Sequence, residues 1–157
     1  MSQNIPLYGQ NAKGGVLGEV ADGKTYGHET LPLTTDRSLD ASDSGKTIFV
    51  DATGAAAEVD INLPAVAAGL NFRFIVSENT PTQDVKIVAS GAIVYGTLSE
   101  YFIEAAGTLT NRIAAAGVTN VLFDQTCLKG DWIEYYCDGT SWYINGACSV
   151  AGGFTTS

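Results

Sequence analysis

The residues of this chain that could carry chemistry are few, and the most suggestive run is SGKT, residues 44 to 47. It matches the end of a phosphate-binding loop, in which backbone N–H groups and a lysine surround a phosphate. That loop needs a glycine five residues before Gly45, where this chain has Asp40. Asp43 would also place a negative charge beside the phosphate. The run therefore predicts a surface turn ahead of a strand.

His28 is the only histidine of the chain. A histidine acts as a general base when the fold supplies a nucleophile and an orienting acid. His28 stands at the edge of a glycine-rich segment, which is a poor support for preorganised chemistry. Since no nucleophile and base stand together in a pattern, we predict no catalytic residues, and a small hydrolase is a weaker hypothesis than the two given at the end of this subsection.

Acidic residues gather in two places, but neither matches a known cation-binding motif. A D-x-x-x-D-x-x-D spacing is not that of an EF-hand loop, so turn and capping roles explain these residues, with a weak calcium site as the alternative. A zinc site is not expected, because the chain has no C-x-x-C pair. We predict neither metal nor cofactor. The two clusters are Asp36, Asp40, Asp43 and Asp124, Asp131, Asp138.

Three cysteines stand at Cys127, Cys137 and Cys148, an odd number that leaves one unpaired in a monomer. If the hairpin described below forms, Cys137 lies beside its turn and Cys148 lies at the far end of the returning strand. At about 3.3 Å per residue they would be beyond the roughly 7 Å reach of a disulfide. We expect free, buried thiols, in keeping with assembly in a reducing cytoplasm.

Composition indicates one β-rich domain. The 157 residues include 18 glycines, only 16% are charged, and the net charge is −9. Such an acidic chain repels phosphate backbones, so nucleic acid is not an expected partner. The start has no apolar core of a signal peptide and no run approaches ~18 apolar residues, so neither export by the usual route nor a membrane partner is expected.

Short strand patterns recur along the chain without alternating helices. The regular alternation at Leu70, Phe72, Phe74 and Val76 predicts a strand with one buried face. Residues 98–118 could continue a strand or form a short alanine-rich helix. No internal repeat of 20–50 residues is evident in the sequence. The spacing predicts an all-β fold, an antiparallel β-sandwich or barrel-like domain with an extended N-terminal arm. Further strands are expected around 47–51, 59–63, 85–89, 91–96 and 120–124.

The stretch 130–148 is expected to be the hairpin on which the core is built. Asp138-Gly139 is a strong hairpin signal between two aromatic runs. A two-residue turn there would pair Tyr135 with Trp142 and Ile133 with Ile144, whereas a three-residue loop with a bulge at Gly139 would shift the pairing by one. The aromatic residues serve either the core or a ligand platform. The expected core residues of the hairpin are Trp132, Tyr135, Trp142 and Ile144.

The two ends differ from the domain of residues 31–150. Residues 1–30 are rich in glycine and carry scattered single apolar residues. They form either a disordered tail or, as the apolar residues favour, an arm that becomes ordered on another subunit. Residues 151–157 are expected to fray or to dock on a neighbour. The arm residues expected to contact a partner are Ile5, Leu7, Tyr8, Val16 and Leu17.

Several runs resemble a module common in structural proteins of tailed-bacteriophage virions, which include capsid decoration (cement) proteins. The runs are L-x-x-x-D-S-G-K-T-x-x-V-D (residues 39–51), I-N-L-P-A-x-x-A-G-L-x-F-x-F-I-V (61–76), K-G-D-W-I-E (129–134) and D-G-T-x-W-Y-I-x-G (138–146). The resemblance covers residues 36–148. It implies an all-β domain, frequent trimers and no catalysis, and it carries over no binding residues.

Two functions follow as hypotheses. The first is a capsid decoration protein that is assembled in the host cytoplasm, binds the outer surface of the head as a homotrimer and stabilises the shell, with the major capsid protein as its partner. The second is a module of a tail fibre, tail tip or head fibre that binds host glycans. In that case Trp132, Trp142, Tyr136 and Tyr143 would present stacking faces.

Overall fold

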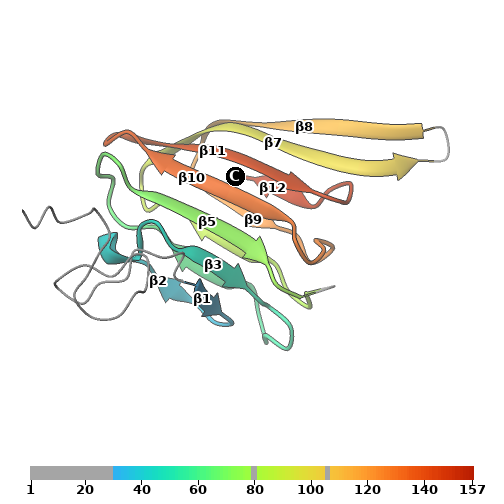
Figure 1. Cartoon of the computed structure of the whole chain (residues 1–157), viewed down its shortest axis with the longest axis horizontal. Coiled ribbons are helices and arrows are strands. Elements are labelled where there is room, and N and C mark those ends of the chain that lie inside the picture. Colours follow the sequence, from blue (N-terminus) through green and yellow to red (C-terminus); the bar gives the residue numbers. More distant parts are fainter. Residues whose placement is uncertain (1–29, 79–80, 105–106) are drawn as a thin grey trace, which may run out of the picture.

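The computed structural model describes residues 30–78, 81–104 and 107–157, with side chains described for 33–78, 81–101 and 113–157. Strands dominate these residues and form two sheets that face each other, which confirms the predicted all-β sandwich (Figure 1). The seven-stranded sheet has the order β1 (Thr30–Leu33), β3 (Thr47–Val50), β5 (Asn71–Val76), β10 (Trp132–Cys137), β11 (Ser141–Cys148), β7 (Ile93–Glu104) and β8 (Gly107–Val118). The five-stranded sheet has the order β12 (Phe154–Thr156), β9 (Asn120–Phe123), β6 (Val85–Val88), β4 (Val59–Asn62) and β2 (Arg37–Ser38).

Both sheets are mixed, whereas the sequence pattern had indicated antiparallel pairing. From β1 to β6 the chain alternates between the two sheets, so that β1, β3 and β5 are parallel neighbours in one and β2, β4 and β6 in the other. Parallel neighbours need a connection that leaves the sheet and returns, and here the strand of the opposite sheet supplies it. The chain in the first half of the domain therefore winds as a flattened superhelix through the two sheets.

In the last two windings of this superhelix, paired residues are separated by the same number of positions in both sheets. Residue Thr47 pairs with Arg73 in the seven-stranded sheet, and Val59 pairs with Val85 in the five-stranded sheet, both 26 positions apart. The Ser77 hydroxyl donates to the Val50 carbonyl oxygen at 3.0 Å between the windings. Three of the aligned pairs are identical, and the other five differ, so the repeat is weak in the sequence; the identical pairs are Val50 with Val76, Val59 with Val85 and Ile61 with Ile87.

Strands β7 and β8 resolve the ambiguous stretch of the chain. They form one long antiparallel hairpin that extends beyond the ends of the neighbouring strands (Figure 1). The alternative of an alanine-rich helix is wrong, because Ala114, Ala115 and Ala116 pair along β7. Val94, Leu98 and Ala115 are buried, so the base of the hairpin belongs to the core.

The C-terminal segment is part of the sandwich. Strand β12 pairs with β9 through Phe154 and Phe123, whose ring centroids lie 5.6 Å apart. The expectation that residues 151–157 fray or dock on a neighbour is therefore wrong, since Phe154 is 2% exposed and extends the core. The N–H of Phe154 also donates to the buried Glu100 carboxylate on β7, which joins the two sheets.

The core lies between the sheets and is centred on aromatic residues of three adjacent strands. Trp142 on β11 packs against Phe72 on β5, with ring centroids 5.9 Å apart, and edge-on against Tyr135 on β10 at 6.1 Å. Tyr135 in turn meets Phe74 edge-on at 5.7 Å. Such rings bury roughly 150–250 Å² each, so this cluster supplies much of the hydrophobic stabilisation.

The hairpin of β10 and β11 has a register that neither sequence alternative anticipated. Cys137 pairs with Trp142 and Tyr135 pairs with Ile144, a shift of two positions from a turn centred on Asp138-Gly139. The reason is the Asp138 side chain, whose Oδ1 accepts hydrogen bonds from the N–H groups of Thr140 and Ser141, both at 2.8 Å. Gly139 and Thr140 thus form the loop, with Gly139 at φ +104°. A shift of two changes the partners but keeps Tyr135, Trp142 and Ile144 on one face.

Acid should weaken this turn through Asp138. The N–H groups of Ser141 and Thr140 hold the pKa of Asp138 down to about 2, below its ordinary value of 3.8. A depressed pKa contributes stability that is present above about pH 4 and is lost as the pH falls through about 2. Asp138→Asn keeps an acceptor oxygen but cannot titrate. We expect its melting temperature to fall less than that of the wild type between pH 4 and pH 2. Parallel profiles for both proteins would contradict this role.

Candidate functional site: the outer face of the seven-stranded sheet

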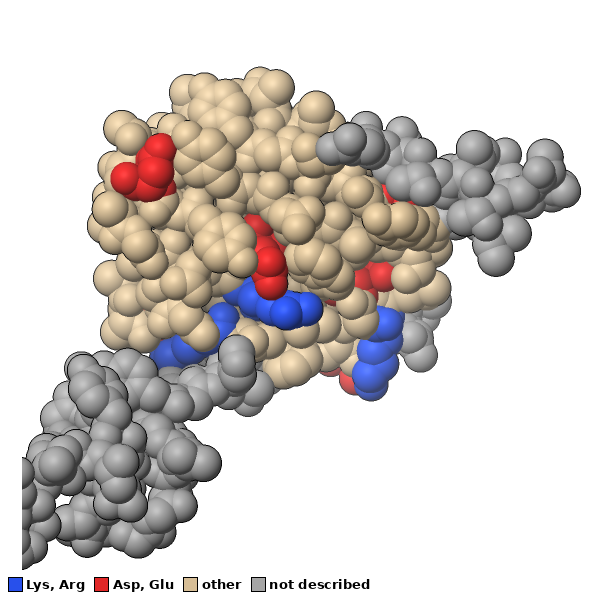
Figure 2. Space-filling view, turned by 45° about the horizontal axis from the view of Figure 1, so that its top comes forward, with Lys and Arg blue, Asp and Glu red and all other residues tan. Residues whose placement is uncertain are grey.

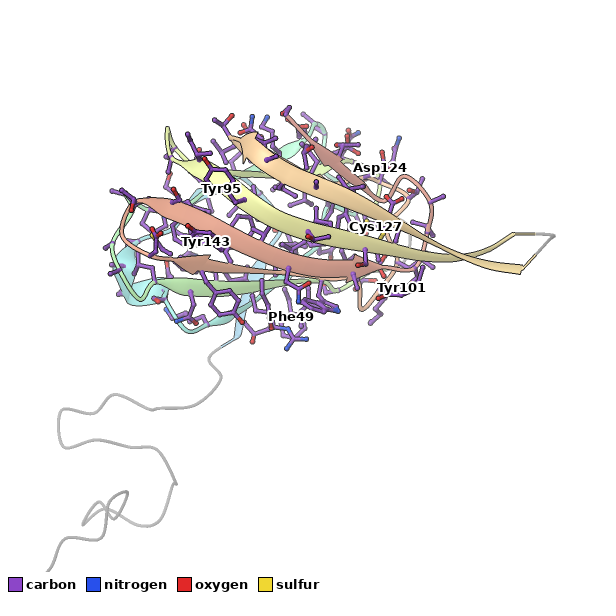
Figure 3. All side chains as sticks on the ribbon, turned by 90° about the horizontal axis from the view of Figure 1, so that it is seen from above. Phe49, Tyr95, Tyr101, Asp124, Cys127 and Tyr143 are labelled. Atoms are coloured by element: carbon purple, nitrogen blue, oxygen red, sulfur yellow. The ribbon has the colours of Figure 1, made fainter. Side chains whose placement is uncertain are left out.

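The outer face of the seven-stranded sheet carries a row of three tyrosines. Tyr136 on β10 pairs with Tyr143 on β11, and Tyr143 pairs with Tyr95 on β7. Period-two alternation turns all three away from the core, and 50%, 45% and 40% of their surfaces are exposed, in that order. The rings of Tyr95 and Tyr143 lie 6.2 Å apart. Figure 3 labels Tyr95 and Tyr143 on these strands, with Tyr101 further along β7 and Phe49 on β3.

Beside this row lies a chain of polar contacts. The Tyr136 hydroxyl donates to Glu134 Oε2 at 2.9 Å, and Glu134 Oε1 lies 3.4 Å from Arg73 Nη1. The Arg73 guanidinium in turn covers the ring of Trp132, 5.1 Å from the ring centroid. These pairs follow the register, because Glu134 lies opposite Arg73 and the polar residues alternate with aromatic ones. The contacts fix the exposed aromatic rings in place.

A shallow groove of about 230 Å³ runs over this part of the face. Tyr136 forms one wall, and Arg73, Glu134 and Asn71 present polar groups to it. The Asn71 side-chain Nδ2 donates to the Gly69 carbonyl oxygen at 3.2 Å. An aromatic wall with a few flanking polar groups can hold a polar ring that has apolar C–H faces.

The face is poor in charge for a chain with a net charge of −9. Figure 2 shows a mostly uncharged surface on which acidic and basic groups are few. Arg73 and Glu134 offset each other, and Ile93 and Tyr101 add exposed apolar area, at 42% and 51% exposure. An aromatic face of this breadth with little charge is typical of an interaction surface.

The tyrosine hydroxyls act as donors to neighbouring carboxylates. The hydrogen bond to Glu134 raises the pKa of Tyr136 above its usual value of 10.0, and the one to Asp138 does the same for Tyr143. Tyr143 donates to Asp138 Oδ2 at 3.1 Å. Both hydroxyls therefore stay protonated near neutral pH, so the tyrosines add no charge to the face.

The structure separates the aromatic residues that the sequence grouped together. Tyr135, Trp142 and Ile144 are buried as expected. The expectation for Trp132 as a core residue is wrong: it is half-buried on the outer face, because alternation from the buried Ile133 turns it outward. Conversely, Trp142 is fully buried and presents no stacking face, in contrast to the glycan hypothesis.

Two residues of the face were not singled out by sequence reasoning. Tyr95 and Tyr101 join it because β7 lies parallel to β11. The available signal was alternation in β7, where Val94 and Leu98 are buried and Tyr95 must point outward. No pattern in the sequence indicated the strand pairing that brings Tyr95 next to Tyr143.

The SGKT run forms the predicted surface turn. Asp40 caps the short 3-10 helix Ala41–Asp43, and Ser44 accepts from the Asn71 N–H at 3.0 Å. Lys46 Nζ donates to Asp43 Oδ1 at 2.8 Å, so its ammonium is held by a carboxylate. Gly45, at φ +85°, follows before β3 begins. These contacts tie the turn to β5 and give it no phosphate-binding geometry.

Other candidates lie outside this face or outside the described residues. His28 and the arm residues belong to residues 1–29, which the structure does not describe; they are Ile5, Leu7, Tyr8, Val16 and Leu17. Among the described residues, no three His, Cys, Asp or Glu side chains gather in a way that could hold a metal ion. Within the same residues, no helix has the length and apolar character needed to cross a membrane.

Comparison with known proteins assigns no family. No protein-family model matches the sequence, and no curated protein matches it.

Proposed function

We propose that this chain is a structural protein of a tailed-bacteriophage virion, a capsid decoration (cement) protein. It binds the outer surface of the head and stabilises the shell, and it assembles as a homotrimer. The observation that carries the proposal is the uncharged aromatic face formed by Tyr136, Tyr143 and Tyr95. The sequence resemblance to virion modules over residues 36–148 points the same way.

The face suits a protein partner because it is broad, shallow and aromatic. Tyrosine, tryptophan and arginine are enriched at protein interfaces, where their large side chains lose little conformational entropy on binding. Tyr143 and Trp132 are held by contacts to Asp138 and Arg73, so they are already placed for binding. Preorganised rings of this kind often contribute most of the affinity of an interface.

The arm gives the second contact. A closed trimer carries three copies of the arm, so modest contacts to the major capsid protein add by avidity. We assign these contacts to the single apolar residues of the arm, such as Ile5, Leu7 and Leu17. In this proposal the sandwich domains form the trimer, and the arms attach the trimer to the shell.

Deleting residues 1–20 from the full-length protein is expected to abolish binding to purified shells while the sandwich remains folded. Binding is measured by co-sedimentation with shells that lack the protein, and folding by far-ultraviolet circular dichroism. The described contacts of the domain begin at Thr30, so the deletion removes none of them. Retained shell binding, or loss of the fold, would contradict the proposal.

A charge on the aromatic face tests the role of the sheet separately. Tyr95→Glu should break the trimer into monomers, seen as a lower mass in analytical ultracentrifugation. Thr155→Glu adds the same charge to an exposed position of the five-stranded sheet and should leave the trimer intact.

The copy number in purified virions tests the position of the protein on the particle. A number comparable with that of the major capsid protein would support the head, and a small number would favour the tail or a vertex.

Glycan binding is the second candidate, and the groove beside Tyr136 favours it. A sugar ring stacked on Tyr136 would meet Arg73 and Glu134 at its edge. Because Arg73 covers Trp132, a bound glycan should change the fluorescence of Trp132 and leave that of the buried Trp142 unchanged. A host glycan that alters the emission of the wild type but not of Trp132→Phe would support this function. Emission that never responds would count against it.

A further inference from the structure

Two buried thiols, one in a loop and one at the end of a strand, meet at the end of the sandwich. Cys127 lies in the turn after β9, and Cys148 ends β11. Cys127 is 0% exposed and Cys148 is 2% exposed. A Cβ added to Gly153 would lie 2.7 Å from Cys148 Sγ and 3.3 Å from Cys127 Sγ, so both sulfur atoms converge on the same glycine. Figure 3 labels Cys127, with Asp124 in the same turn.

We propose that Cys127 and Cys148 form a modification site, at which reaction with a small disulfide such as oxidised glutathione closes a disulfide between β11 and the turn after β9. The two thiols share a hydrogen bond in which Cys127 donates to Cys148, and each sulfur also lies close to a carbonyl oxygen of the loop that follows β11. Cys127 Sγ lies 2.9 Å from the Gly153 carbonyl oxygen, and Cys148 Sγ donates to the Val150 carbonyl oxygen at 3.2 Å. In the reduced protein the pair therefore fastens this loop, and in the oxidised protein it would join β11 to the turn after β9.

The surroundings of Cys148 make it the first thiol to react. It is among the residues that line a shallow groove of about 170 Å³, together with Asp131, Trp132 and Ser149. The hydrogen bond with Cys127 lowers the pKa of Cys148, while that interaction and burial raise the pKa of Cys127. The thiolate is the nucleophile in disulfide exchange, so the residue beside the groove is also the one more easily ionised.

A loop movement is needed for the reaction, and the structure indicates which one. Ser149 is held by Asp131, whose Oδ1 accepts from the Ser149 N–H at 3.0 Å and from its hydroxyl at 2.7 Å. Release of these two contacts would open the end of the groove toward the Cys148 sulfur. Asp131 itself is only 3% exposed and also accepts from the Leu128 N–H at 2.8 Å. Oxidation should therefore be slow and should follow local opening.

The chemistry proceeds in two exchanges. The Cys148 thiolate attacks one sulfur of oxidised glutathione, which forms a mixed disulfide and releases one glutathione thiolate. Cys127 then loses its proton and attacks the Cys148 sulfur, which forms the Cys127–Cys148 bond and releases the second glutathione thiolate. Two protein thiols are oxidised, one glutathione disulfide is reduced, and the two protons end on the two glutathione molecules.

The test treats the free full-length protein with oxidised glutathione, blocks remaining thiols after unfolding, and maps peptides without reduction. We expect a Cys127–Cys148 link and an unreacted Cys137, which is the internal control because it lies at the other end of β10. Closing this loop should raise the melting temperature by roughly 5–10 °C. Three free thiols after treatment, or links that include Cys137, would overturn the proposal.

Variants separate the two steps. Cys127→Ser should stop the reaction at a glutathione adduct on Cys148, and Cys148→Ser should give neither adduct nor link. Cys137→Ser should still form the link. An adduct that persists on Cys148 in the wild type would overturn the proposal, because it would mean that Cys127 cannot reach the mixed disulfide. Peptide mapping of the wild type needs no variant, so the proposal remains testable even if a serine variant fails to fold.

Discussion

Replacing Trp142 with alanine is expected to lower the free energy of unfolding by about 3–5 kcal/mol, the largest loss for any single side-chain truncation in the domain. Trp142 is fully buried and joins Phe72 of β5 to Tyr135 of β10. The alanine variant would leave a cavity between three strands that their backbone pairing prevents from collapsing. Since domains of this size have only about 5–15 kcal/mol of stability, the variant should be close to unfolding at 37 °C.

The neighbouring residue provides the control. Tyr143→Ala should cost less than about 1 kcal/mol, because the Tyr143 ring is 45% exposed and loses only the contact with Tyr95 and the hydrogen bond to Asp138. Urea denaturation at one fixed protein concentration gives both values, and the concentration must be fixed because the proposed trimer would add apparent stability. Equal losses for the two variants would mean that the faces of β11 are wrongly assigned.

A third variant refines this prediction. The Trp142 Nε1–H is buried without a hydrogen-bond partner in the described structure. Trp142→Phe removes this unpaired donor together with part of the ring, and the two effects oppose each other. We therefore expect a loss well below that of Trp142→Ala. If the phenylalanine variant were as unstable as the alanine variant, this prediction would be wrong, and the core would require the full shape of the indole ring.

Alternation along a strand explains what the sequence could and could not predict about faces. Phe72, Phe74 and Val76 were expected on one buried face, and they are buried. Trp132 and Tyr135 are an odd number of positions apart, so a regular strand cannot bury both. Grouping them as core by residue type was the error, and the same parity rule places Tyr143 outward when Trp142 is inward.

Pairing between distant strands could not be predicted in this way. The tyrosine row requires β7 to lie beside β11, although Tyr95 and Tyr143 are far apart in the chain. It also requires the two-residue shift imposed by the Asp138 side chain. Neither leaves a local pattern, so the sequence indicated that aromatic residues were important but not which of them form a surface.

The alanine-rich stretch shows a tertiary effect on secondary structure. Alanine favours helices and is uncommon in strands, so Ala114 to Ala116 argued for a helix. The adjacent β7 provides backbone partners along β8 except at Gly117, which the register skips, and the burial of Ala115 against the core adds to this. Backbone pairing with a long neighbour therefore outweighs the intrinsic preference of the residues.

Gly96→Ala is expected to lower the free energy of unfolding by about 3 kcal/mol or more. Gly96 lies in β7 directly opposite Ile144 of β11 and has a φ of +143°. A Cβ at this position would overlap the Ile144 carbonyl oxygen and lie 2.8 Å from the Ile144 backbone nitrogen. These are backbone atoms of a central strand, so the clash can be relieved only by separating β7 from β11.

Gly152→Ala is the matched control, because Gly152 also has a positive φ, of +73°, but nothing lies within 4 Å of an added Cβ. It should lose about 1–2 kcal/mol from backbone strain alone, so the difference between the two variants measures the clash. Shortening Ile144 to valine should not rescue Gly96→Ala, since the contact is with its backbone. Rescue by that second change, or equal losses for the two glycine variants, would mean that β7 and β11 do not approach as closely as the pairing of Gly96 with Ile144 requires. The same separation would remove Tyr95 from the tyrosine row, so Gly96→Ala should also weaken the trimer that we propose.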